Sequence, residues 1–333
     1  MKCAYVTQPG PPESLIYGDQ PDPVVQAHQV LVKVSVSAIN PIDTYIRAGS
    51  IPMPVEFPYT PGCDLAGTVI AIGENVSRFR VGDRVWGTNQ GLFKRQGTMA
   101  ELAAVDEGWL YHTPEGMSDE DAAAGALTGI TSHLGLFRDA QLKAGEWVFV
   151  NGGTGGVGSM VLQLAKAAGA RVVTTAGSEA KRQLCLELGA DVALDYKSTT
   201  LDDEIKAATA VNGGIDVWWE TQREPNITRT IGLMKRRGRI VVMAGRQAQL
   251  QFTLGPFYTN DLQLLGFAMF NASPDEQRRS ADDLNEWYTQ GRWKPLIGAR
   301  FPLIEAAAAH RLQEENTLGQ KHTLTGKVLV TIG

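Results

Sequence analysis

The stretch from Trp147 to Gly158, WVFVNGGTGGVG, decides the fold of the middle of this chain. A short apolar run, Trp147–Val150, leads directly into a glycine cluster with the pattern G-x-G-x-x-G at Gly153, Gly155 and Gly158. A strand, a glycine turn and a helix start, in that order, are the fingerprint of a dinucleotide-binding βαβ unit. The glycines let the backbone approach a pyrophosphate, and the helix N-terminus offers free N–H groups and a favourable dipole. The sequence therefore predicts a dinucleotide site at this turn.

Segments beyond this turn alternate between helical and strand-like character. Helices are expected over 159–168 and 180–188, and each is followed by a glycine that can end it. The expected strands after Trp147–Val150 are 171–175, 191–196, 215–220, 239–244 and 262–267. Strands that alternate with helices of this length indicate a doubly wound parallel sheet of the Rossmann type. We expect this α/β domain to span residues 126–270.

The two ends of the chain have a different character. Residues 1–125 contain short segments rich in Val and Ile, such as 29–35 and 66–72, and glycine and proline interrupt them repeatedly. This pattern is typical of a barrel-like or irregular β domain. Residues 271–333 are mixed, with two expected helices and a closing strand over 326–332.

Composition narrows the class of protein. The chain has 333 residues, enough for two domains, with a formal net charge of −5, which argues against a broad surface for nucleic acid or anionic membranes. Its three cysteines are far apart and form no C-x-x-C pair, so we expect no disulfide framework and a reducing, cytoplasmic environment. We expect no signal peptide, and no apolar run approaches the roughly 20 residues that span a bilayer.

The segment after the second strand of the Rossmann domain bears on the choice of dinucleotide. NAD-binding domains usually place an acidic residue there to bind the ribose 2′-hydroxyl. This chain has Ala176, Gly177 and Ser178 at the expected strand end, and Lys181 and Arg182 follow closely. A 2′-phosphate is an anion that such side chains can bind, so the sequence favours NADPH over NADH. Glu179 lies between them and also suits the first turn of a helix.

Four motifs together resemble a known family. They are NPIDTYIR over 40–47, YTPGCDLAG over 59–67, VGDRV over 81–85 and the glycine turn. The chain resembles the zinc-independent, zeta-crystallin-like quinone oxidoreductases of the medium-chain dehydrogenase/reductase superfamily. This resemblance implies a GroES-like catalytic domain built from both chain ends, an inserted Rossmann domain, an active site in the cleft between them, and a homodimer or homotetramer.

The resemblance also implies which residues form the site. Tyr45, Asn40 and Asp43 are expected to be catalytic, near the nicotinamide. Tyr45 is also an expected cofactor contact. Met243 and Met269 could instead be core residues. The other expected cofactor contacts are Thr131, Thr154, Gly155, Gly156, Val157, Gly177, Lys181, Tyr196, Asn226, Met243, Ala244, Gly245, Arg246, Phe267, Ala268 and Met269.

No metal site is expected. Zinc-dependent relatives of this superfamily have a cysteine ligand near the position of Asn40 and a His-Glu pair where this chain has Cys63 and Asp64. The structural zinc lobe of those relatives needs four cysteines, and residues 85–105 contain none. Catalytic zinc takes three protein ligands among Cys, His and carboxylates. Cys63 is more simply a small buried residue.

Three stretches depart from the family pattern or have a second interpretation. Thr221-Gln222-Arg223 stands where a glycine usually follows the fourth strand, and bulky Trp218 and Trp219 precede it. Residues 89–96 form a longer segment than expected, which could reshape the substrate mouth. The basic cluster 235–239 suggests a helix C-terminus with cations at its dipole, or, as a minor alternative, an RNA-binding patch.

These observations predict a zinc-free enzyme that uses NADPH to reduce a quinone or an α,β-unsaturated carbonyl. A conjugated acceptor spreads charge to a remote oxygen, so it needs no metal. The hydroxyl of Tyr45 or solvent would supply the proton. Two alternatives stay open: a zinc-dependent alcohol dehydrogenase, and an RNA-binding or structural protein that retains NADPH binding.

Overall fold

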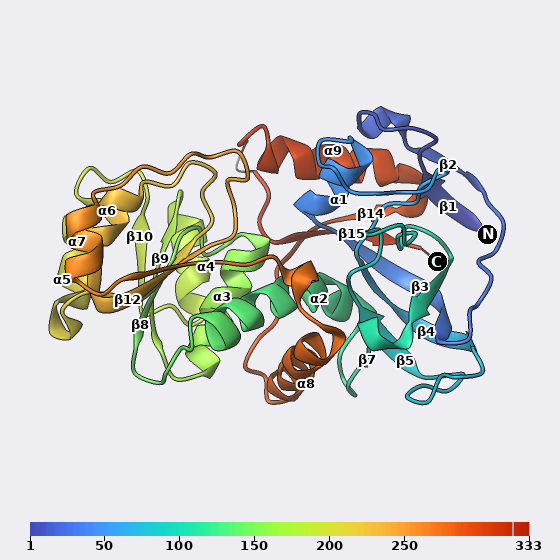
Figure 1. The fold of residues 1–333 in the computed structure, drawn as a ribbon, viewed down its shortest axis with the longest axis horizontal. Coiled ribbons are helices and arrows are strands. Elements are labelled where there is room, and N and C mark those ends of the chain that lie inside the picture. The colour runs from blue at the N-terminus through green and yellow to red at the C-terminus, as the bar shows by residue number, and fades with distance from the viewer. Residues whose placement is uncertain (322, 333) are drawn as a thin grey trace. The chain divides into compact units, whose positions relative to one another are not determined.

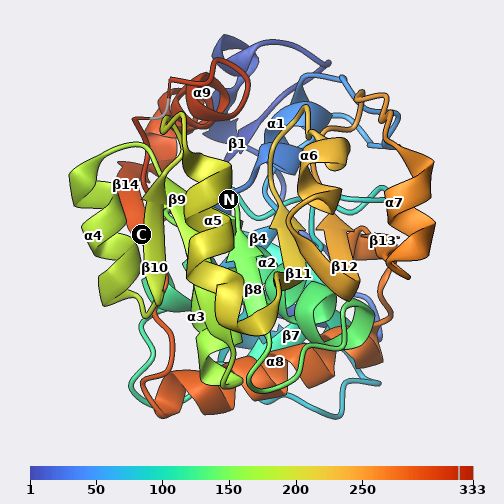
Figure 2. The same cartoon turned by 90° about the vertical axis from the view of Figure 1, so that its left-hand side faces the viewer.

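The computed structural model describes residues 1–321 and 323–332, which divide into two compact units (Figures 1 and 2). Unit 1 comprises Met1–Ile130, Ser273–Gln290 and the chain from Lys294 onward, and unit 2 comprises Thr131–Ala272 and Gly291–Trp293. Both chain ends therefore belong to unit 1. The return of Gly291–Trp293 to unit 2 was not expected from the sequence; there, Arg292 Nη1 donates to the carbonyl of Ala167 at 3.4 Å.

Unit 1 is built around a mixed sheet that joins the two ends of the chain. Its strand order is β14-β15-β3-β4-β5-β7, and β6 also pairs with β3. The last strand, β15, is antiparallel to β3 and lies beside it in Figure 1. A separate hairpin pairs β1 with β2. The strands are β1 (Lys2–Tyr5), β2 (Ile16–Asp19), β3 (Gln29–Ile39), β4 (Asp64–Ile72), β5 (Arg84–Gly87), β6 (Leu102–Asp106), β7 (Leu110–His112), β14 (Ile297–Pro302) and β15 (Lys327–Thr331).

Alternation along β3 explains how this sheet buries one face. Val30, Val32 and Val34 point to the same side and are fully buried in a cluster with β4, β5 and β6, as period-two alternation requires. A second cluster packs helix α9 against β3 and β15. The helices that belong to unit 1, wholly or for most of their length, are α1 (Pro41–Arg47), α2 (Asp119–His133), α8 (Pro274–Thr289) and α9 (Ala306–Thr317).

Unit 2 is a parallel sheet with the strand order β10-β9-β8-β11-β12-β13, which Figure 2 shows face on. All five neighbouring pairs are parallel. In chain order this is 3-2-1-4-5-6, the doubly wound Rossmann arrangement. The strands are β8 (Trp147–Val150), β9 (Arg171–Ala176), β10 (Val192–Asp195), β11 (Ile215–Glu220), β12 (Met234–Val242) and β13 (Gln263–Gly266). The helices are α3 (Gly156–Ala167), α4 (Glu179–Glu187), α5 (Leu201–Thr209), α6 (Ile227–Ile231) and α7 (Leu254–Thr259). The predicted fold class is confirmed.

The two tryptophans of β11 are core residues on opposite faces of this sheet. Trp218 pairs in register with Phe149 of β8, and their rings stack with centroids 3.9 Å apart. That face is covered by α5 and α6, which contribute Ile205 and Ile227 to the same cluster. Trp219 instead meets Phe267 edge-on at 6.2 Å. The bulky pair therefore fills both layers beside the central strand.

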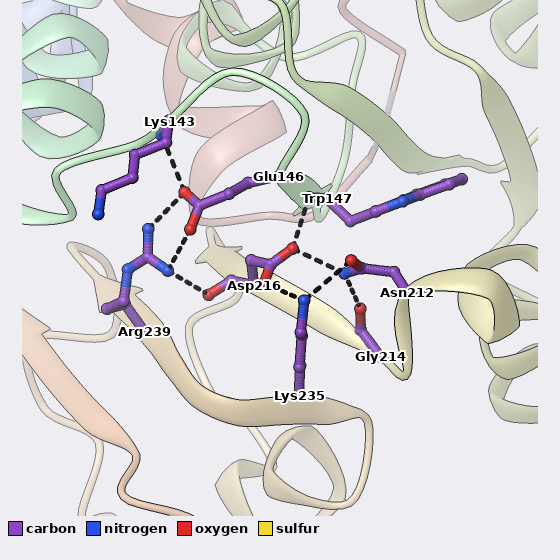
Figure 3. A network of polar contacts seen from close by, with 8 residues as sticks. All are labelled: Lys143, Glu146, Trp147, Asn212, Gly214, Asp216, Lys235 and Arg239. Carbon is purple, nitrogen blue, oxygen red and sulfur yellow. Dashed lines mark hydrogen bonds and ion pairs between the residues drawn. The ribbon is translucent and has the colours of Figure 1, made fainter.

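A polar network holds the amino ends of β8, β11 and β12 together (Figure 3). Arg239 binds both carboxylate oxygens of Glu146, at 3.0 and 2.7 Å. Asp216 accepts from the backbone N–H of Trp147 at 2.8 Å, and its other oxygen lies 3.3 Å from the ammonium of Lys235.

This network corrects the expected position of the basic cluster 235–239. The cluster lies within strand β12 and not at a helix C-terminus, because the preceding helix α6 already ends at Ile231. Lys235, Arg236 and Arg239 each pair with an acidic side chain of unit 2. Their charges are largely used within the fold.

Candidate functional site

The glycine turn of unit 2 has the geometry that its sequence predicts. Strand β8 ends at Val150 and helix α3 begins at Gly156. A Cβ on Gly158 would lie 2.2 Å from the carbonyl oxygen of Gly152, so this helix can pack on the turn only with glycine there. A Cβ on Gly155 would meet nothing closer than 3.5 Å. The space above Gly155 is therefore open for a ligand to approach the backbone.

All predicted cofactor contacts of unit 2 except Thr131 lie after the carboxyl ends of strands in the sequence. The carboxyl ends of parallel strands meet at one edge of the sheet, where ligands of such folds bind. Thr131 is buried in the last turn of α2, and Asn226 caps α6 by accepting the N–H of Arg229 at 3.0 Å. The predicted contacts that follow these strands in the sequence are Thr154, Gly155, Gly156 and Val157 after β8, Gly177 and Lys181 after β9, Tyr196 after β10, Asn226 after β11, Met243, Ala244, Gly245 and Arg246 after β12, and Phe267, Ala268 and Met269 after β13.

The region after β9 and β10 forms a basic and aromatic corner. A Cβ on Gly177 would lie 2.4 Å from the hydroxyl of Tyr196, so the tyrosine packs directly against this strand end. Ser178 caps α4 and accepts the backbone N–H of Lys181 at 3.3 Å. Arg182 forms ion pairs with Glu179 and with Asp195, the latter at 3.0 Å. Two carboxylates thus already balance the guanidinium of Arg182.

A cavity of about 340 Å³ opens at the same edge of the sheet. Its lining joins the glycine turn to the ends of β10 and β11. The residues are Phe149, Asn151, Tyr196, Ser198, Thr199, Thr200, Leu201, Asp202, Asp203, Gln222 and Arg229. Most of the lining residues are polar, and one of them, Tyr196, is a predicted cofactor contact.

In unit 1, a buried polar cluster surrounds the N-terminus of α1. Asn40 is the N-cap, and its backbone N–H donates to Asp43 Oδ2 at 2.8 Å, which closes a capping box. The side-chain amide of Asn40 donates to Asp64 Oδ2 at 2.7 Å. Lys327, the first residue of β15, donates to Asn40 Oδ1 at 2.5 Å and lies 3.7 Å from Asp64 Oδ2. Asn40 and Asp43 are therefore held inside unit 1 by hydrogen bonds.

Burial dominates the electrostatics of this cluster. The pKa of Asp43 is raised to about 7, chiefly by burial; the hydrogen bond with the Cys63 thiol opposes this rise, and the nearby charge of Asp64 adds to it. Burial also raises the pKa of Asp64 and lowers that of Lys327, while their mutual attraction opposes both shifts. Over the described residues, the ammonium of Lys327 is the one positive charge of this cluster, and it faces two carboxyl groups, Asp43 and Asp64. Protonation of Asp43 therefore leaves one negative charge opposite one positive charge.

Tyr45 lies in the middle of α1, which is fixed at both ends. At the C-terminal end, the buried guanidinium of Arg47 pairs with Glu314 of α9. The carbonyl of Tyr45 accepts the backbone N–H of Ser50 at 2.9 Å as the chain leaves the helix. The side chain of Tyr45 is half-buried, whereas Asn40 and Asp43 are at most 1% exposed. Of the three predicted catalytic residues, Tyr45 is the one that reaches the surface of unit 1.

Comparison with known proteins identifies these two units. Residues 26–115 match the family described as alcohol dehydrogenase GroES-like domain, and residues 156–286 match zinc-binding dehydrogenase. The chain is 34% identical to the quinone oxidoreductase of Rattus norvegicus over 312 residues, which cover 93% of each chain. The chain belongs to the quinone oxidoreductase family. The predicted family and the predicted class of enzyme, an oxidoreductase, are confirmed.

Solved structures agree with this placement. A crystal structure of Escherichia coli quinone oxidoreductase complexed with NADPH has a TM-score of 0.86 at 25% identity, covering 99% of this chain and 100% of that chain. A crystal structure of an NAD-dependent alcohol dehydrogenase has a TM-score of 0.90 at 28% identity, covering 100% of both chains. The quinone oxidoreductase family therefore shares its fold with dehydrogenases that differ in cofactor and substrate.

The family description raises the question of zinc, and the residues present do not fit it. Within residues 1–321 and 323–332, no group of three or more His, Cys, Asp or Glu side chains is placed to hold a metal ion. Beside Asp64, the positive charge comes from the ammonium of Lys327. Cys63 is fully buried, as predicted, and burial raises the pKa of its thiol well above the ordinary value, which disfavours the thiolate that zinc requires.

The long segment 89–96 is held by hydrogen bonds to the loop that follows α1. Phe93 N–H lies 3.4 Å from Met53 Sδ, and Lys94 N–H donates to the carbonyl of Pro54 at 2.9 Å. Asn89 donates from its side chain to Gln277 Oε1 at 2.9 Å. Both Phe57 and Phe93 expose more than two-fifths of their surface. The two loops are therefore held together, and each exposes one phenylalanine.

Three polar residues of the site were not predicted from the sequence: Asp64 as a partner of Asn40, Lys327, and Glu220 at the end of β11. Lys327 precedes the apolar run Val328–Val330 of β15, and Glu220 follows the apolar run Val217–Trp219 of β11. A charged residue next to a buried apolar run is a signal that it has a polar partner. The partners themselves come from other parts of the chain and could not be named from spacing.

Proposed function

We propose that this enzyme uses NADPH to reduce a quinone or an α,β-unsaturated carbonyl. The observation that carries the proposal is the edge of the unit 2 sheet, where an open glycine turn, a basic and aromatic corner and a polar cavity follow adjacent strands. Membership of the quinone oxidoreductase family supports the reaction class. When bound, the dinucleotide supplies the hydride.

The residues present fit NADPH. The backbone N–H groups at the start of α3 would hold the pyrophosphate, because no side chain covers Gly155. Lys181 and Tyr196 would receive the 2′-phosphate, because Lys181 lies in the first turn of α4 after β9 and the hydroxyl of Tyr196 packs against the end of the same strand. The residues after β12 and β13, Met243–Arg246 and Phe267–Met269, remain our proposal for the nicotinamide half.

Within unit 1, we assign the direct catalytic role to Tyr45. Its hydroxyl is a donor on a fixed helix and can give a hydrogen bond to the acceptor oxygen. Asn40 and Asp43 act as positioning residues in this proposal, because both are buried and bonded to the backbone or side chains of unit 1. Phe57 and Phe93 are exposed on the loops beyond α1 and would suit an apolar acceptor.

Oxidation of NADPH, and separately of NADH, tests the proposal. The purified enzyme is given a naphthoquinone, an ortho-quinone, an enone and a simple ketone after treatment with a metal chelator. We expect turnover of the conjugated acceptors with NADPH and none of the ketone. Tyr45→Phe keeps the ring and removes the hydroxyl, so it should lower kcat more than it weakens NADPH binding. Turnover of the ketone that depends on added zinc would instead support an alcohol dehydrogenase.

The cluster 235–239, which was the candidate surface for RNA binding, does not support that role. Three cations of the cluster 235–239 are paired with acidic side chains. A protein that bound RNA through phosphate contacts would show strongly salt-dependent affinity. We expect no such binding to an A/U-rich RNA at physiological salt.

We further propose a homodimer or homotetramer that works in the cytoplasm. Strand β13 is the outer strand of the unit 2 sheet, and nearby α7 exposes Leu254 and Tyr258, which is typical of a surface that pairs with another chain. Cys3, Cys63 and Cys185 are all buried and free, which suits a reducing compartment. No helix in the described part of the chain is long and apolar enough to cross a membrane. Light scattering of the purified protein measures the oligomer size.

A further inference from the structure

The carboxylate of Glu220, at the carboxyl end of β11, is buried beneath the glycine turn with a specific set of partners. Its side chain is 3% exposed. Oε1 accepts from Asn151 Nδ2 at 3.1 Å and from the backbone N–H of Gln222 at 2.7 Å. Oε2 accepts from the indole of Trp218 at 3.1 Å. Among the residues that the structure describes, no cation forms an ion pair with it, so these three N–H groups stabilise the charge.

Asn151 transmits this contact to the turn itself. It is the first residue of the glycine cluster, and its Oδ1 accepts the hydroxyl of Thr175 at 3.1 Å. The same hydroxyl oxygen of Thr175 accepts the backbone N–H of Gly152 at 3.2 Å. A chain of hydrogen bonds therefore runs from Glu220 through Asn151 and Thr175 to the backbone of the turn.

The carboxylate also fixes which way the amide of Asn151 points. A carboxylate can only accept hydrogen bonds, so the NH₂ group of Asn151 must face Glu220 and its oxygen must face Thr175. If residue 220 offered a donor, the amide could turn around and the bond from Thr175 would be lost. Both direct partners of Glu220 toward the ligand side, Asn151 and Gln222, line the 340 Å³ cavity.

We propose that Glu220 is a positioning residue for the dinucleotide: it holds Asn151 and the glycine turn in the conformation that receives the pyrophosphate, and it shapes the wall of the adjoining cavity. The inference rests on the proposed use of NADPH. Because the pyrophosphate is common to NADPH and NADH, Glu220 affects the affinity for both. Lys181, by contrast, distinguishes them.

Asp216 provides a matched control on the same strand. It is also a buried acid of β11, but it lies at the amino end, where it accepts from Trp147, Asn212 and Lys235 (Figure 3). Loss of the Asp216 carboxylate should lower the stability of the protein and leave the proposed cofactor site, at the carboxyl ends of the strands, unchanged. The comparison thus separates an effect on the turn from a general loss of stability.

The experiment is titration of the full-length protein with NADPH and NADH, followed by cofactor fluorescence, for the wild type, Glu220→Ala, Glu220→Gln, Asn151→Ala and Asp216→Asn. Glu220→Ala should raise the Kd of both cofactors by the same factor of roughly ten, the size of one lost charge-assisted hydrogen bond. Saturating NADPH should restore kcat to near the wild-type value.

Asp216→Asn should lower the Tm and leave both Kd values unchanged. In the Asn151→Ala background, Glu220→Ala should add little, because both act through one chain of contacts.

Three outcomes overturn the inference. One is a folded Glu220→Ala protein with unchanged Kd values, or, if that variant does not fold, unchanged values in both Glu220→Gln and Asn151→Ala. Another is an equal loss of affinity in Asp216→Asn, which would make the effect one of general stability. The third is a wild type that binds neither cofactor; this result overturns the proposed function itself, and it is seen before any variant is compared.

Discussion

The ammonium nitrogen of Lys327 lies 2.5 Å from the side-chain oxygen of Asn40. This contact joins the last strand of the chain to the N-cap of α1, the helix that carries Tyr45. Arg47, at the other end of α1, pairs with Glu314 of α9. Both anchors of the helix therefore come from the C-terminal part of unit 1, and α1 is fixed only when the two chain ends have packed together.

Replacement of Lys327 by methionine tests this anchor. The variant keeps most of the side-chain volume but leaves Asp64, which is fully buried, without its cation. Removal of one partner from a buried pair typically costs about 3–5 kcal/mol. We expect a loss of this size in the free energy of unfolding, measured with urea, together with a lower kcat. Lys321→Met, which removes an exposed ammonium paired with Glu315, is the control and should change neither value.

Asp43 should make stability depend on pH in a characteristic direction. Its pKa is about 7 in the folded protein and 3.8 in the unfolded chain, so the native state holds the proton more tightly. Stability from this group is fully present below pH 4 and is lost as pH rises toward and through 7. Asp43→Asn removes this dependence. Relative to the wild type, the variant should therefore gain stability between pH 4.5 and 8, on the order of 3 kcal/mol at most. Urea unfolding across that range measures the gain, and a difference that stays constant with pH would contradict it.

Lys181 should determine the preference between the two nicotinamide cofactors. Loss of its ammonium removes a charge-assisted contact to a 2′-phosphate, so Lys181→Ala should weaken NADPH binding by about tenfold. NADH has no such phosphate, and its affinity should stay the same. Fluorescence titration gives both constants, and Lys206→Ala, which changes a surface lysine of α5, controls for overall charge. Equal weakening of both cofactors would place Lys181 elsewhere in the site.

Most strands and helices of the fold could be predicted from local sequence patterns, because each apolar run and its flanking glycines lie close together in the sequence. Trp147–Val150 matches its predicted bounds because it is an apolar run with clear ends, and Ile215–Glu220 matches because an apolar run, Val217–Trp219, forms its centre. The start of β12 was not predicted, because the charged residues 235–237 do not look like a strand. In the structure, Lys235 pairs with Asp216 and Arg236 pairs with Asp261. The same limit applies to the site. Glycines and their spacing identify the turn, whereas Lys327 and Glu220 act through partners that only the folded chain brings near.

Two glycines of the turn should respond to the same substitution in opposite ways. At Gly158, the Cβ of alanine would lie 2.2 Å from the carbonyl oxygen of Gly152, so α3 must move away from the turn. We expect Gly158→Ala to lower the Tm and the cofactor affinity together. At Gly155, the nearest atom to a new Cβ is 3.5 Å away and the backbone φ is −75°, so alanine fits the protein alone. The added methyl group instead occupies the space where the pyrophosphate would approach the backbone. Gly155→Ala should therefore keep the wild-type Tm and lose affinity for NADPH and NADH alike. Thermal unfolding with and without cofactor distinguishes the two cases, and a Gly155→Ala protein that is stabilised by NADPH as much as the wild type would show that the pyrophosphate binds elsewhere.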